Sequence, residues 1–200
     1  MAIIRLTGLI YDFTVESFQQ RAQRAIDDGA SVIVIELDTP GGVMTSAIKL
    51  SRAIKQLSVP VVAWVHDEAF SAGTLIAAAC RFVVMSPRST LGDCAPIVPG
   101  QNLAATERAK ALSPLLEEFR DSALANGYDF AMFQAMCELG VELYLIEHKQ
   151  TGQRRVVNAA DYQWMVHGID TPARGMNLII TQPAATTQPD GVNQALLDIS

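Results

Sequence analysis

The stretch FSAGTLIAAA, residues 70–79, joins an apolar run to a segment of small and apolar residues that suits a helix. The run before it is VVAWV at 61–65. Ser71 stands where a helix N-cap belongs, and small residues follow it directly. Such a serine can simply cap the helix. It can also be a nucleophile, because a turn from strand to helix exposes the hydroxyl and directs backbone N–H groups at one point.

A second turn of the same kind lies earlier in the chain. Residues 31–37, SVIVIEL, are nearly all apolar, which is typical of a strand buried on both faces of a parallel sheet. The turn DTPGG at 38–42 follows, and its paired glycines would let the backbone approach a ligand closely. Ligands bind at the carboxyl ends of parallel strands, so we expect both turns to lie at one edge of the sheet.

The spacing of apolar residues predicts an α/β fold with a mostly parallel sheet, because strands and helices alternate as βαβ units. A strand-rich segment with a hairpin and a short helix is expected at 141–180, and a flexible tail at 181–200. The predicted strands are 3–10, 31–37, 61–66, 82–85 and 141–147, and the predicted helices are 15–28, 43–57, 71–80, 104–126, 130–139 and 159–166, with a loop at 98–103.

Composition excludes several classes of protein. The 200 residues are 50% hydrophobic and carry a net charge of −6, which suits one domain with a sizeable core and argues against a nucleic-acid binder. The three cysteines, Cys80, Cys94 and Cys137, lack metal-type spacing, and we expect no disulfide framework, metal or cofactor. No signal peptide or apolar run of about 20 residues is present, so the chain as given is expected to be soluble.

The two turns together favour acyl-transfer chemistry. One N–H from the turn Gly41–Gly42 and one from Ala72 could form an oxyanion hole beside the Ser71 hydroxyl. His66 lies close to Ser71 at the end of a predicted strand and is interpreted as structural, whereas His148 and His167 lie in the tail and have no obvious route to this serine. Lys110 has small and apolar neighbours that could desolvate its amine and make it a base, although spacing alone favours a solvated surface lysine.

Four motifs carry a family resemblance: LDTPGG at 37–42, VPVV at 59–62, SAGT at 71–74 and LGDCAP at 91–96. Together they resemble the NfeD-like, membrane-bound ClpP-class serine proteases, which are relatives of signal peptide peptidase A, the Clp protease subunit and the crotonases. The resemblance covers about residues 3–140. It implies a ClpP/crotonase fold, a spiral of ββα units, and a ClpP-like protease domain at 1–140.

The resemblance also implies roles for single residues. Ser71 matches the nucleophile and Lys110 the base of a Ser–Lys dyad, while Gly42 and Ala72 match the oxyanion positions. An extended peptide would bind by strand addition along residues 42–44, with Val43 and Met44 as substrate-binding residues. The implied substrates are apolar segments of membrane partners such as stomatin-like proteins, and the implied assembly is a homo-oligomer.

Two other functions stay open on the sequence. A protease-like domain could bind and assemble with a membrane partner without catalysis, and labelling of Ser71 by a fluorophosphonate would exclude this. A crotonase-type acyl-CoA enzyme would also use two N–H donors, and Glu68 is its nearest candidate carboxylate. That enzyme would bind CoA.

Overall fold

The computed structural model describes residues 1–96, 105–169 and 192–194. The chain forms two compact units, Met1–Tyr128 and Asp129–Ser200, and each is described by itself.

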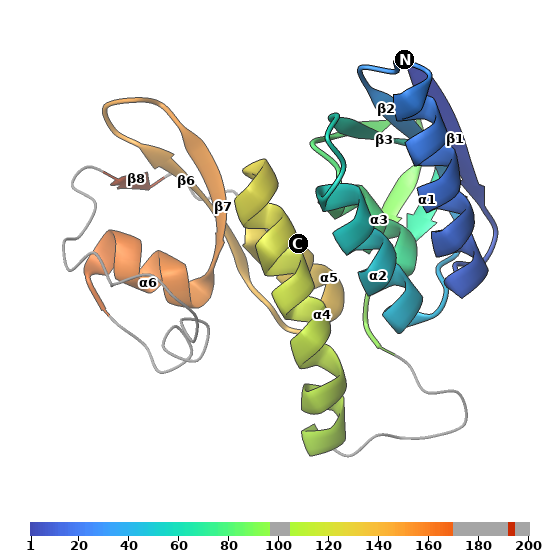
Figure 1. Ribbon diagram of the computed structural model, residues 1–200. Coiled ribbons are helices and arrows are strands. Elements are labelled where there is room, and N and C mark those ends of the chain that lie inside the picture. Colours follow the sequence, from blue (N-terminus) through green and yellow to red (C-terminus); the bar gives the residue numbers. More distant parts are fainter. Residues whose placement is uncertain (97–104, 170–191, 195–200) are drawn as a thin grey trace. The chain divides into compact units, whose positions relative to one another are not determined.

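A parallel sheet organises the first unit (Figure 1). Its strands run in the order β1-β2-β3-β4, with β5 paired to β3, and every pairing is parallel. The predicted α/β class with a mostly parallel sheet is therefore confirmed. The elements of this unit are β1 (Ala2–Thr7), α1 (Asp12–Asp27), β2 (Ile33–Thr39), α2 (Met44–Lys55), β3 (Val61–Phe70), α3 (Ala72–Ala79), β4 (Phe82–Met85), β5 (Thr90–Gly92) and α4 (Ala105–Asn126).

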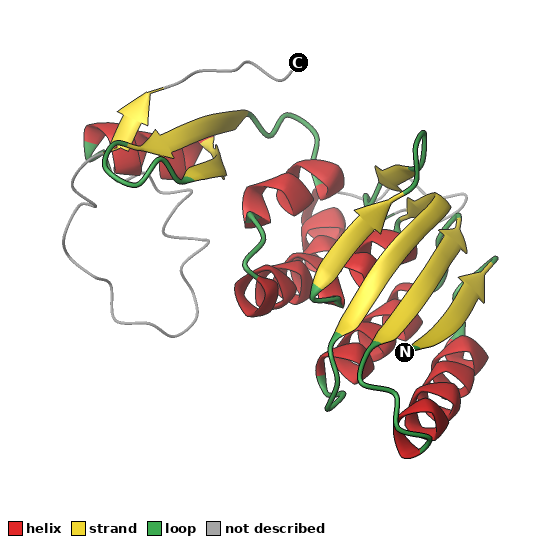
Figure 2. Cartoon of the chain, turned by 90° about the horizontal axis from the view of Figure 1, so that it is seen from above, coloured by secondary structure: helices red, strands yellow, loops and turns green. Residues whose placement is uncertain are grey.

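The helices cover one face of this sheet. In Figure 1, α1, α2 and α3 lie side by side in front of the strands, which Figure 2 shows from above. Ile33, Ile35 and Leu37 of β2 point toward these helices and are fully buried. The residues between them are only half-buried, so the expectation of a strand buried on both faces was wrong. The opposite face also carries exposed apolar side chains, among them Phe82 and Val84.

Strand β3 is longer than the sequence predicted. It continues through residues 67–70, where a loop was expected after residue 66, and it ends at the residue before Ser71. The extension pairs with β5, with Glu68 opposite Thr90 and Phe70 opposite Gly92. The polar residues Asp67 and Glu68 break the apolar pattern, and the pairing partner lies more than 20 residues away. Local patterning therefore could not reveal the extension.

A small antiparallel sheet in the order β7-β6-β8 organises the second unit. The predicted hairpin is present, and its core contains Ile146, Val157 and Tyr162. Helix α5 packs on β7 and groups with this unit, whereas the sequence placed the domain boundary after residue 140. The elements are α5 (Phe130–Cys137), β6 (Leu143–His148), β7 (Arg154–Asn158), α6 (Ala159–His167) and β8 (Val192–Gln194).

Part of the predicted flexible tail is a strand. Residues 192–194 of that tail form β8, which pairs with β6. The other residues of 181–200, and the predicted loop at 98–103, lie outside the described residues.

Glu118 joins α4 to α2. Its carboxylate is 4% exposed and accepts hydrogen bonds from Ser51 Oγ at 2.7 Å, Arg52 Nε at 3.0 Å and Lys55 Nζ at 2.7 Å. Burial by itself would raise the pKa of Glu118, but the hydrogen bonds from Lys55, Ser51 and Arg52 outweigh it and hold the pKa below its usual range. The charged form of Glu118 is therefore part of the packing between the two helices.

This network predicts a loss of stability in acid. Because the folded-state pKa of Glu118 lies below the unfolded value, its contribution is fully present above about pH 4.5 and is lost as the pH falls through the folded-state pKa. Glu118→Gln should weaken this acid dependence and lower the free energy of unfolding at pH 7 by about 3 kcal/mol. Urea unfolding at a series of pH values measures both effects.

Glu117→Gln is the matched control, because Glu117 is half-exposed and its carboxylate lies 3.5 Å from Arg120. Its effect should stay below about 1 kcal/mol. Equal effects of the two substitutions would contradict the assigned role of Glu118.

Candidate active site

Ser71 occupies a strained turn between β3 and α3. Its φ of 50° and ψ of −109° lie where residues other than glycine are uncommon. The Ser71 N–H donates to the carbonyl of Gly92 at 2.8 Å, which fixes this conformation against β5. The Ser71 side chain makes no capping hydrogen bond to α3. Ser71 is thus not a conventional N-cap, and of the two interpretations the strained turn favours that of a nucleophile.

Thr74 fastens this turn from inside the molecule. Its hydroxyl is fully buried and lies 2.7 Å from the carbonyl oxygen of Ala69 and 3.0 Å from that of Gly92. It also accepts the N–H of Gly92 at 2.9 Å. One side chain therefore links the end of β3, the end of β5 and the first turn of α3. Thr74 belongs to the motif SAGT, but nothing in the sequence marked it as a site-forming residue.

Thr39 fastens the glycine turn in the same way. Its buried hydroxyl donates to the carbonyl of Gly8 at 2.6 Å and accepts the N–H of Gly41 at 3.1 Å. Beyond it, Gly42 faces Ile10 in a parallel bridge, and a Cβ atom on Gly42 would overlap the backbone of Ile10. Only glycine fits this position without a shift of the chain.

The bridge to Ile10 decides where the backbone groups of Gly42 point. Ile10 donates its N–H to the carbonyl of Gly41 at 2.9 Å and accepts the N–H of Val43 at 2.8 Å. In this pattern Ile10 pairs with the residues on either side of Gly42, namely Gly41 and Val43. The N–H and C=O of Gly42 itself are therefore directed away from Ile10. Within the described part of the chain, no hydrogen bond occupies the N–H of Gly42 or of Ala72. Both groups are available to an acceptor.

The two turns touch each other. A Cβ atom on Gly73 would lie 2.6 Å from Thr39 Cγ2, so the threonine methyl packs directly on the backbone of α3. A Cβ atom on Gly41 would lie 3.0 Å from Ser71 Cβ and 3.5 Å from Ser71 Oγ. The expectation that both turns meet at the carboxyl edge of the sheet is therefore met.

A pocket of about 280 Å³ opens beside Ser71. It brings together five of the six predicted site residues: Ser71, Gly42, Ala72, Val43 and Met44. From α4 the sequence predicted Lys110, whereas the structure places Ala111 and Leu115 of that helix in the lining, and the residues after β5 reach the pocket only through the tertiary fold. The remaining lining residues are Ala47, Leu75, Cys94, Ala95, Pro96, Ala111 and Leu115, so most of the wall is apolar.

Lys110 does not line this pocket. Its side chain is exposed, whereas its neighbour Ala111 belongs to the lining. Among the described residues, no hydrogen bond joins Lys110 to Ser71. The exposed lysine that spacing alone favoured is what this arrangement shows, and the Ser–Lys dyad that the family resemblance implied stays a prediction.

Other features of the described residues offer less to catalysis. They include no group of His, Cys, Asp and Glu that could hold a metal ion. His66 is exposed on β3 and packs edge-on against Trp64, and none of the histidines lines the pocket beside Ser71. Glu68 lies in β3 and does not line that pocket either.

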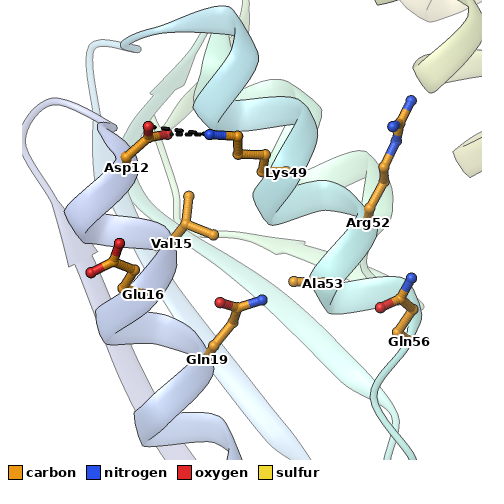
Figure 3. A pocket seen from close by; sticks show the side chains of 8 residues that line it. All are labelled: Asp12, Val15, Glu16, Gln19, Lys49, Arg52, Ala53 and Gln56. Carbon is orange, nitrogen blue, oxygen red and sulfur yellow. Dashed lines mark hydrogen bonds and ion pairs between the residues drawn. The ribbon is translucent and has the colours of Figure 1, made fainter.

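A larger hollow of about 390 Å³ lies between α1 and α2 (Figure 3). Asp12 spans it by an ion pair with Lys49 at 3.0 Å. Hydrogen bonds from Ser46 and Lys49 lower the pKa of Asp12, so this carboxylate is charged at neutral pH. No serine, threonine or cysteine lines this hollow, so the smaller pocket beside Ser71 is the candidate active site.

Comparison with known proteins agrees with this geometry. A family model described as the N-terminal domain of NfeD1b matches residues 10–161. The chain belongs to the NfeD1b N-terminal domain family. It is 36% identical over 127 residues to the membrane protein NfeD1b of Bacillus subtilis, and 34% identical over 99 residues to the membrane-bound protease PH1510 of Pyrococcus horikoshii. The matches cover 63% and 48% of this chain, but only 28% and 22% of those longer proteins.

Solved structures share the fold. One is a serine-to-alanine variant of the 1510-N membrane-bound stomatin-specific protease, with a TM-score of 0.62 and 28% identity over 68% of each chain. Another is a lysine-to-alanine variant in complex with a substrate peptide, with a TM-score of 0.60 and 25% identity over 68% of this chain and 64% of that one. The ClpP-like fold that the motifs implied is thereby confirmed.

The relatives are named as membrane proteins. Among the described residues of this chain, no helix combines the length and the apolar character that a membrane span requires.

The contact between Thr39 and Gly73 can be tested by a double-mutant cycle. Gly73→Ala should destabilise the protein by about 2 kcal/mol through overpacking, although alanine is the better helix former. Thr39→Ser removes the offending methyl and keeps the hydroxyl, at a cost of about 1 kcal/mol. The double variant should recover about 1 kcal/mol of coupling energy in urea unfolding. Strictly additive effects would show that the two turns do not meet here.

Proposed function

We propose that this chain is the protease domain of a serine endopeptidase, with Ser71 as nucleophile and Lys110 as general base. The observation that carries the proposal is the strained Ser71 turn, which opens on the same pocket as the unoccupied N–H groups of Gly42 and Ala72. This is the constellation that acyl transfer needs. The names of the relatives, membrane-bound and stomatin-specific proteases, support the same reaction class.

The mechanism follows from these groups. Ser71 Oγ attacks the scissile carbonyl carbon as its proton passes to the neutral amine of Lys110. The N–H groups of Gly42 and Ala72 donate to the oxyanion that forms. The C–N bond then breaks, and the protonated lysine returns the proton to the leaving amine. Water attacks the acyl-enzyme with the lysine as base, which releases the carboxylate and regenerates Ser71.

The pocket also suggests how a peptide binds. The C=O of Gly42 points away from Ile10 and can accept a hydrogen bond from an extended peptide that adds as a strand along residues 42–44, while the N–H of Gly42 serves the oxyanion. The apolar wall, which includes Met44, Leu75 and Leu115, suits an apolar side chain of the substrate. Apolar segments of membrane-associated, stomatin-like proteins are therefore the proposed substrates, and assembly into a homo-oligomer stays a prediction.

One observation favours a second candidate function. Because Lys110 is exposed and does not line the pocket beside Ser71, the chain could serve as a protease-like module that binds a membrane partner without cleaving it. The two functions differ in the reactivity of Ser71. A fluorophosphonate labels an activated serine and leaves an inert one unmodified.

Single substitutions test the dyad directly. Ser71→Ala should abolish both fluorophosphonate labelling and cleavage of apolar peptides. Lys110→Ala should lower kcat by about 10²- to 10⁴-fold, because a general base contributes that much. Lys110→Arg should not restore activity, because a guanidinium cannot act as a base.

Arg108→Ala is the matched control, since Arg108 is an exposed cation two residues away on the same helix. It should leave kcat unchanged. Labelling of Ser71 with full activity in Lys110→Ala would retain the nucleophile and reject the base. No labelling of wild-type protein would favour the binding module.

A further inference from the structure

Helix α4 has a fixed part and an exposed part. From Leu115 onward its side chains hold it against α2 and α3. Glu118 accepts three hydrogen bonds from α2, Phe119 is fully buried, and Asn126 Nδ2 donates to the carbonyl of Ala78 at 3.0 Å. This part of α4 cannot move without breaking buried polar contacts.

The earlier part of α4 is attached more weakly. Residues 107–110 are all exposed, and only Leu112 among the residues at 107–114 is buried. The two parts of one helix therefore differ in how firmly the rest of the molecule holds them.

Pro114 lies at the junction of these parts, in the interior of the helix. Proline has no N–H, so the helical hydrogen bond from residue 114 to the carbonyl of residue 110 is missing, and the proline ring crowds that carbonyl. Residue 110 is Lys110. The weakest point in the backbone of α4 is therefore the turn that carries the proposed base.

Lys110 lies beside the pocket-facing side of α4, so a small movement of this weak turn could bring it to the pocket. Ala111 and Leu115 lie one turn apart on the same face of α4, and both line the pocket beside Ser71. Lys110 is rotated from Ala111 by about 100° around the helix axis and points to solvent. A turn of the first segment by about one residue would replace Ala111 by Lys110 at the pocket.

We propose that Pro114 is a hinge that lets the first segment of α4, residues 105–113, turn and carry Lys110 from solvent to the Ser71 pocket. This inference rests on the proposed function and adds its regulation: the dyad forms only when the segment turns. Pro114 is thus a positioning residue, and the network around Glu118 is the fixed base against which the hinge works.

Disulfide trapping tests the motion without any catalysis. Cys94 lines the pocket, and its Sγ lies 3.9 Å from the backbone oxygen of Ser71. In the variant Lys110→Cys, oxidation can join residue 110 to Cys94 only if their Cα atoms approach to within about 7 Å. Cys80 is fully buried and burial raises the pKa of its thiol, so it should not compete.

We expect Lys110→Cys to form the disulfide with Cys94, identified by mass spectrometry of peptides. Adding Pro114→Ala should slow formation of the disulfide about tenfold. Alanine restores the missing helical hydrogen bond, so the state in which residue 110 has turned to the pocket becomes rarer. Ala111→Cys is the matched control. Residue 111 already faces the pocket, so its disulfide should form at the same rate with proline or alanine at 114.

Two results would overturn the hinge: no disulfide in Lys110→Cys, or a rate that Pro114→Ala leaves unchanged or raises. Far-UV circular dichroism shows that each variant is folded, and alanine favours the helix at position 114.

A separate fluorophosphonate assay on wild-type protein distinguishes failure of the hinge from failure of the proposed protease. Trapping without labelling of Ser71 retains the motion and rejects the catalysis, whereas labelling without trapping does the reverse. In an active enzyme, Pro114→Ala should lower kcat with little change in KM and in the pH at which activity rises, because it changes how often Lys110 arrives and not its chemistry.

Discussion

The site depends on a close contact between two turns, where the methyl of Thr39 packs on the backbone of Gly73. This contact requires a small side chain on one turn and none on the other. It sets the glycine turn after β2 against the serine turn after β3, so that the N–H groups of Gly42 and Ala72 open on one pocket. Neither turn could supply two donors and a hydroxyl by itself.

Hydrogen bonds from two buried threonine hydroxyls hold the glycine turn and the strained serine turn in place. Thr39 holds the glycine turn to the backbone of Gly8, and Thr74 holds the serine turn to β5. A serine with positive φ persists only when its surroundings determine it fully. The pairing of Phe70 with Gly92 and the hydrogen bond from Ser71 to Gly92 provide that determination. The short strand β5 thus contributes as much to the site as the longer strands do.

Helix α4 completes the pocket from a distant part of the chain. Glu118 and Pro114 give its two parts different attachment to the rest of the molecule. The charged carboxylate of Glu118 holds the later part on α2, in an environment where the loss of one partner would leave a buried charge. Pro114 weakens the earlier part. The pocket wall at Leu115 is therefore fixed, whereas the turn with Lys110 is held more weakly. A protease built in this way would have a rigid oxyanion hole and a base whose arrival can be controlled.

The sequence by itself determined the α/β class, the order of the βαβ units, the two turns and the family, because local periodicity and short motifs encode them. It also named Ser71, Gly42, Ala72, Val43 and Met44, which the structure brings together around one pocket. Tertiary structure alone decided the length of β3, the exposure of apolar side chains on one face of its sheet, and the part that Thr39, Thr74, Ala111 and Leu115 play in the site. These features depend on pairings and contacts between residues far apart in the chain. A helical pattern does not show which side of a helix faces a turn formed more than 30 residues earlier.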